Sequence, residues 1–198
     1  MNTTLLFVEI FIAGLQGLVW MVLLILNLAG YNWVLHTNVQ GLESWSVLIS
    51  ALIFSFSYSL GIVLDRVANE LFTPWDTKIR AKYIPNEKQS FAIMRYQLEN
   101  EYLNKQLEYT RTRLRIARSS ALNHLLITLF SVGLISSFDF LSIADKWKYG
   151  GAAAVIGMVF VILFVASWYS LTNTNFNLVL KINQEALKNK PTSRKKNA

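Results

Sequence analysis

The sequence contains no cysteine among its 198 residues, and it has only 3 prolines and 2 histidines. The absence of cysteine excludes a disulfide framework and a thiolate metal site. The sequence also has no GxxxxGK[ST] phosphate loop, no GxGxxG fingerprint, and no HExxH, GxSxG or EF-hand motif. Carboxylates within the apolar segments are few and unpaired, and no nucleophile–base pair can be assembled. We therefore expect no enzymatic activity, no metal and no cofactor.

Charged residues are scarce at 16%, whereas hydrophobic residues make up 53% of the chain and the mean hydropathy is +0.34. Crossing a bilayer takes about 20 apolar residues. Four windows reach that length, at residues 5–29, 45–64, 121–141 and 151–171. No polar face repeats along them, which argues against buried helices of a soluble protein. The sequence predicts an all-α, polytopic membrane protein with four transmembrane helices.

The first window could also be a signal peptide. It lacks a basic segment before the apolar run and a small-residue cleavage site after it, and the run is too long. We interpret it as a membrane helix.

The segment between the second and third windows predicts a long helix. Pro85 ends the preceding segment, Asn86 is a suitable N-cap, and Gln89 is the matching capping-box residue. No glycine or proline follows until after Ser131. From Asn86 to Ser120 such a helix would project roughly 50 Å into the cytoplasm before entering the third window.

Two further boundaries follow from local signals. Thr73, Pro74 and Asp76 have the order of cap, first and third helical positions, which predicts a new, short, basic interfacial helix ending at Tyr83. Polar residues 172–175 separate the fourth window from a weakly amphipathic tail helix. The expected units are a transmembrane hairpin (1–72), a cytoplasmic helical segment (73–120), a second hairpin (121–172) and a basic cytoplasmic tail (173–198).

The net charge of +7 is distributed unevenly. Residues 65–120 and the tail hold nearly all the lysine and arginine, residues 30–44 hold none, and residues 138–150 are balanced. The positive-inside rule then places both termini and the long helix in the cytoplasm, with the spans in the cell (inner) membrane.

Polar side chains within the first two windows have two interpretations. They line a pore or the bundle interior, because polar groups at membrane depth avoid lipid. Alternatively, Glu9 reaches the headgroups and the serines only allow close helix packing. The candidates for the pore or bundle interior are Glu9, Gln16, Asn27, Ser50 and Ser57.

Two further groups are candidates for a gate or a subunit contact. Asp65, Arg66 and Glu70 follow the second window, and Arg66 and Glu70 have the i, i+4 spacing of a helical ion pair. Their alternative is an interfacial ion-pair network. A heptad stripe on the long helix predicts self-association as a coiled coil, or packing against the chain itself. The candidates on this stripe are Asn100, Leu103, Leu107 and Leu114.

Four arginines precede the third window: Arg111, Arg113, Arg115 and Arg118. One interpretation is a basic belt that contacts lipid phosphates. The other is a ring, repeated in each subunit, that binds an anionic ligand such as a nucleotide, phosphate or nucleic acid, because guanidinium groups match phosphate geometry.

Two classes of function remain. One is a homo-oligomeric channel or pore in the lipid bilayer, gated by its cytoplasmic helices. The other is a membrane-anchored adaptor that docks a soluble cytoplasmic partner through residues 86–120.

The strings GLQGLVW (Gly14–Trp20) and LDRVANELF (Leu64–Phe72), with the long basic helix before the third window, carry a resemblance. The chain resembles small four-span membrane subunits of bacterial anti-phage defence systems. The resemblance implies that a soluble partner senses infection and that the membrane subunit permeabilises the inner membrane. It carries over no functional residue, and it favours the channel over the adaptor.

Overall fold

A computed structural model of the chain describes residues 3–32, 34, 45–83 and 101–188. Their helices are α1 (Thr3–Ala29), α3 (Ser46–Tyr83), α5 (Glu101–Ser137) and α6 (Ile143–Lys188). Each of these four helices is long and apolar enough to cross a membrane. The described part of the chain contains no strand, so the all-α class is confirmed for it. The predicted start of the long helix at Asn86 and Gln89 lies outside the described residues.

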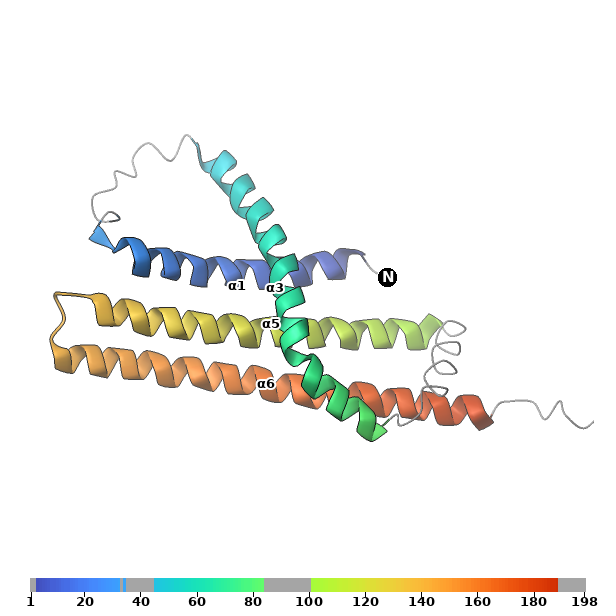
Figure 1. The fold of residues 1–198 in the computed structure, drawn as a ribbon. Coiled ribbons are helices and arrows are strands. Elements are labelled where there is room, and N and C mark those ends of the chain that lie inside the picture. Colours follow the sequence, from blue (N-terminus) through green and yellow to red (C-terminus); the bar gives the residue numbers. More distant parts are fainter. Residues whose placement is uncertain (1–2, 33, 35–44, 84–100, 189–198) are drawn as a thin grey trace, which may run out of the picture.

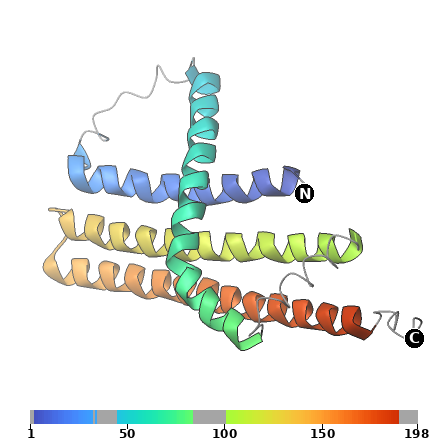
Figure 2. The ribbon, with the colours of Figure 1, turned by 45° about the vertical axis from the view of Figure 1, so that its right-hand side comes forward.

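Three helices lie side by side and the fourth crosses them (Figures 1 and 2). α5 lies between α1 and α6, and α3 contacts all three members of this layer. α1 and α5 run in one direction and α6 returns in the other, so the starts of α1 and α5 and the end of α6 lie at the same end. There α5 and α6 continue past α1 as a helical pair, which we call the stalk (residues 101–110 of α5 and 174–188 of α6).

α1 and α3 cross each other, and their closest contact is at one crossing point. A Cβ atom at Gly14 would overlap the carbonyl oxygen of Ser57, and one at Gly61 would overlap the carbonyl oxygen of Ile10. Small residues allow this close approach of two backbones. Since they are grouped near one turn of each helix, they favour a crossing over contact along the whole length.

α3 is continuous through Pro74, so the predicted helix start at Thr73 is wrong. Proline removes the backbone N–H that would bond to the carbonyl of Glu70 and usually bends a helix. Figure 1 shows such a change of direction in the C-terminal part of α3. The Thr73 hydroxyl donates to the Asn69 carbonyl at 2.7 Å, and the Thr77 hydroxyl donates to the Thr73 carbonyl at 2.8 Å. These two hydrogen bonds link successive turns of the helix on both sides of Pro74.

α6 is also longer than predicted at both ends. The hydroxyl oxygen of Ser142 accepts the backbone N–H of Asp145 at 3.1 Å and the hydroxyl donates to its carboxylate at 2.7 Å, which is a helix cap. The predicted interruption at residues 172–175 is absent. Instead, Asn173 and Thr174 donate to the carbonyls four residues earlier, at 2.9 and 3.0 Å, and the helix continues.

The apolar core lies where α3 crosses α5 and α6. It joins Phe72 of α3, Ala117 and Ala121 of α5, and Trp168 of α6. The rings of Phe72 and Trp168 meet edge to face with centroids 4.8 Å apart, a favourable aromatic geometry. Much of the apolar stripe on α5 is therefore covered by the chain's own helices.

The close contact at the crossing predicts that replacing glycine by alanine has opposite effects on the free energy of unfolding at two positions. Gly61→Ala places a methyl group against the Ile10 carbonyl and should lower the free energy of unfolding by about 1–3 kcal/mol. Gly151→Ala adds a Cβ in α6 with nothing within 4 Å, and should raise it by up to about 1 kcal/mol through helix propensity. Unfolding of the detergent-solubilised protein, followed by circular dichroism, measures both. Equal effects at the two positions would contradict a close-packed crossing.

Candidate functional site

Charged side chains gather where α3 passes over α1 and α5. We call Glu9 of α1, Asp65 and Asp76 of α3, and Arg115 and Arg118 of α5 the crossing cluster. Each of these three helices also contains an apolar window of membrane-spanning length. The cluster brings together side chains that are up to 109 positions apart in the sequence, Glu9 and Arg118.

Arg118 connects α3 to α5, the central helix of the layer. Its side chain is buried, and one guanidinium nitrogen donates to the Asn69 side-chain oxygen at 2.8 Å and to an Asp76 carboxylate oxygen at 3.5 Å. Both partners belong to α3. A buried guanidinium must be paired and hydrogen-bonded, so these contacts fix which turns of α3 can lie over α5.

Glu9 is the second buried charge, and only 5% of its surface is exposed. One carboxylate oxygen lies 3.8 Å from a guanidinium nitrogen of Arg115. Glu9, Asp65 and Arg115 also line a common cavity of about 10 Å³. One oxygen of Asp65 is buried and has no hydrogen-bond partner among the described residues.

The crossing cluster is not balanced in charge. With all groups ionised, its three carboxylates and two guanidiniums leave one negative charge in excess. A low-dielectric site disfavours an unpaired charge, so the excess carboxylate needs a polar partner such as water. A cavity of this size is roughly large enough for one water molecule.

A second set of polar contacts follows the boundary between α1 and α5. Asn123 is completely buried, and its amide nitrogen donates to the Ala13 carbonyl at 3.0 Å and to the Gln16 side-chain oxygen at 3.4 Å. The Trp20 indole N–H donates to the Asn123 side-chain oxygen at 3.0 Å. Further along, the Asn27 amide donates to the Phe130 carbonyl at 2.9 Å. We call Gln16, Trp20, Asn27 and Asn123 the amide ladder.

The structure separates the residues predicted for the pore or bundle interior. Glu9, Gln16 and Asn27 lie on the side of α1 that faces α5, and Ser57 is buried at the crossing of α1 and α3. Ser50, in contrast, is exposed on the N-terminal half of α3.

The predicted gate and contact residues are also divided. Asp65 belongs to the crossing cluster, whereas Arg66 and Glu70 are exposed and make no ion pair with each other in the described structure. Such an exposed pair gains little free energy by closing. Leu107 is buried within the chain, and Leu114 packs against the core. Asn100 lies outside the described residues, and Leu103 is described only as part of α5.

The four arginines do not form one group. Arg115 and Arg118 pair with Glu9 and Asp76, whereas Arg111 and Arg113 are exposed.

Sequence reasoning missed Asp76, Asn69, Trp20 and Asn123 as site residues. Asp76 was assigned to a helix start, which concealed its role as the partner of Arg118. Asn123 carried a usable signal, because an amide inside an apolar segment needs a hydrogen-bond partner. The partners on α1 are more than 100 residues away, so no local pattern identifies them.

Together, the fold and the site define a class: an all-helical chain with four described helices of membrane-spanning length and composition, joined by buried polar contacts. No protein-family model, curated protein or solved structure matches the chain.

The amide ladder predicts energetic coupling between α1 and α5. Trp20→Phe removes the indole N–H and Asn123→Ala removes the amide, and each should destabilise the protein by about 0.5–2 kcal/mol. A double-mutant cycle should give a coupling energy of about 0.5–1.5 kcal/mol, since both substitutions break the same hydrogen bond. Trp147→Phe, at an exposed tryptophan of α6, is the matched control. Strictly additive effects would contradict a shared bond.

Proposed function

We propose that the chain is a multi-pass membrane protein whose copies assemble into a gated pore, with α3 as the moving gate. The observation that carries this proposal is the crossing cluster. Each of its ion pairs joins a buried side chain, Glu9 or Arg118, to a partly exposed one. Even fully buried ion pairs give little stability that apolar residues of similar volume could not supply. Glu9 of this cluster lies within the first apolar window, and ionisable groups at membrane depth commonly belong to ion or proton pathways.

Exposed apolar side chains support the membrane location. They surround the N-terminal half of α3 and the middle of α6, as at Val47, Leu52, Val155 and Ile162. Patches of this extent are covered by lipid or protein in functioning molecules.

Charge supports the proposed orientation. The starts of α1 and α5 and the end of α6 share one end of the layer. The four arginines precede the apolar half of α5, on the side of that end, which we assign to the cytoplasmic side of the inner membrane.

The role of α3 as the gate is inferred from the contacts that hold it against α5. Arg118 holds α3 against α5, and α3 in turn covers Glu9 with the turn that carries Asp65. Moving α3 would open the crossing cluster to water. The adjoining amide ladder would then supply a line of polar groups between α1 and α5 for a hydrated path.

The proposal calls for several copies because the described residues of one chain do not enclose a path. The cavity at the crossing cluster is only about 10 Å³. The heptad stripe first expected to join copies is partly covered inside the chain, at Leu107 and Leu114. We therefore assign the contact between copies to the exposed N-terminal half of α3, which includes Ser50.

The resemblance to defence-system membrane subunits adds an expected trigger, a soluble partner that acts on the stalk to release α3. The adaptor alternative docks a partner through residues 86–120, where Arg111 is exposed next to the stalk, but it needs no conduction. Ion flux distinguishes the two functions.

Weakening the Arg118 contact should open the pore. In liposomes containing purified protein, Arg118→Met should raise ion flux by roughly tenfold, because losing about 1.4 kcal/mol of closed-state stability shifts the equilibrium that far. Arg111→Met, an exposed residue of the same helix with the same charge change, should have no effect. Combining Arg118→Asp with Asp76→Arg should restore low flux.

Folding and assembly must be checked for each variant by size exclusion and mass measurement of the detergent-solubilised complex. A folded Arg118→Met variant that leaks no more than the parent protein would exclude the gate. A monomeric parent protein in tight vesicles would favour the adaptor.

A further inference from the structure

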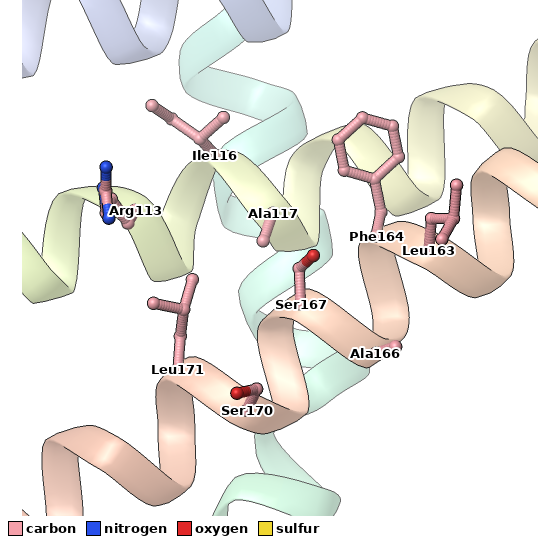
Figure 3. Close-up of a pocket in the computed structure, with 9 residues that line it drawn as sticks. All are labelled: Arg113, Ile116, Ala117, Leu163, Phe164, Ala166, Ser167, Ser170 and Leu171. Carbon is pink, nitrogen blue, oxygen red and sulfur yellow. The ribbon is translucent and has the colours of Figure 1, made fainter.

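A groove of about 710 Å³ lies between α5 and α6 (Figure 3). Its wall is mainly apolar, with Ile116 and Ala117 from α5 and Leu163, Phe164 and Leu171 from α6. Arg113 is the only charged residue among those lining it. Figure 3 shows Arg113 at one end, near Leu171, and Leu163 and Phe164 toward the other.

The charged end and the apolar end of the groove lie at different positions along the helices of the layer. α5 and α6 are antiparallel, so the Arg113 end lies toward the stalk and the Leu163 end lies toward the apolar middle of the helices. From residue 163 to residue 171, α6 rises about 12 Å. The hydroxyls of Ser167 and Ser170 lie along this path. A charged end at the membrane surface with an apolar channel below it matches a phospholipid.

Arg113 is free to bind an anion, unlike two of its neighbours. Arg115 and Arg118 are engaged by Glu9 and Asp76, whereas Arg113 has no carboxylate partner in the described residues. Its guanidinium lies over the ring of Tyr109, 4.6 Å from the ring centroid, which orients the side chain and leaves its N–H groups available. Guanidinium groups bind phosphate oxygens through paired hydrogen bonds.

We propose that this groove is a binding site for an anionic glycerophospholipid. The phosphate accepts hydrogen bonds from Arg113, one acyl chain occupies the groove between α5 and α6, and the serine hydroxyls lie beside the glycerol esters. The proposal rests on the membrane location in the proposed function and is independent of the pore.

Lipid binding to the detergent-solubilised protein, measured by native mass spectrometry, tests the proposal. Phosphatidylglycerol and phosphatidylcholine with identical acyl chains are compared at equal concentration. The parent protein should retain phosphatidylglycerol at least several-fold more strongly. Arg113→Met should abolish this preference, by roughly tenfold in affinity, since charge-assisted hydrogen bonds to phosphate are lost. Arg111→Met, exposed and two residues away, should preserve it.

A second variant tests the apolar part of the site. Ala166 is exposed and lines the groove, so Ala166→Trp should fill it and reduce the binding of both lipids while size exclusion stays unchanged. Inorganic phosphate at millimolar concentration should not displace phosphatidylglycerol.

Three outcomes would overturn the proposal: equal retention of the two lipids, equal effects of Arg113→Met and Arg111→Met, or full displacement by inorganic phosphate, which would indicate a site for a free anion. Because the measurement involves no flux, tight vesicles would remove the pore and leave the lipid site intact.

Discussion

The desolvated guanidinium of Arg118 is the constraint on which the arrangement of the helices depends. A charge buried between helices needs partners with well-placed oxygen atoms, and α3 supplies them with Asn69 and Asp76. Two turns of α3 must therefore lie directly over this part of α5. Once they do, Asp65 comes to lie beside Glu9 and Arg115, and the remaining charges of the crossing cluster are brought together.

Two contacts of different physical character flank this charged centre. On the α1 side, backbones approach closely through Gly14 and Gly61, and on the α6 side, Phe72 packs against Trp168. Both contacts tolerate small rotations of α3 more readily than a pair of directional hydrogen bonds does. In the proposed pore, α3 turns about these contacts while the hydrogen bonds to Arg118 break and re-form. A change at the stalk would thereby be transmitted to the polar boundary between α1 and α5.

Local sequence rules failed mainly at helix ends, and for related reasons. Thr73 and Pro74 have the order of a helix start, yet the helix continues because residues on both sides of the proline, such as Phe72 and Ile79, pack into one core. Residues 172–175 are polar, yet their side chains bond to the preceding turn. The start of α6 was readable in principle, since Ser142 and Asp145 have capping spacing. Propensity is a weak guide wherever tertiary packing rewards a longer helix.

Composition and apolar run length alone determined the all-helical class and the four long apolar segments, because a window of about 20 apolar residues has few other structural uses. They also marked Glu9, Gln16 and Asn27 as side chains in need of partners. The identity of those partners was decided only by the tertiary structure. Asn123, Arg115 and the Phe130 carbonyl lie about 100 positions away in the chain, and which of them meet depends on where α3 crosses the layer. That crossing point is set by close contacts and buried charges, which no periodicity in the sequence encodes.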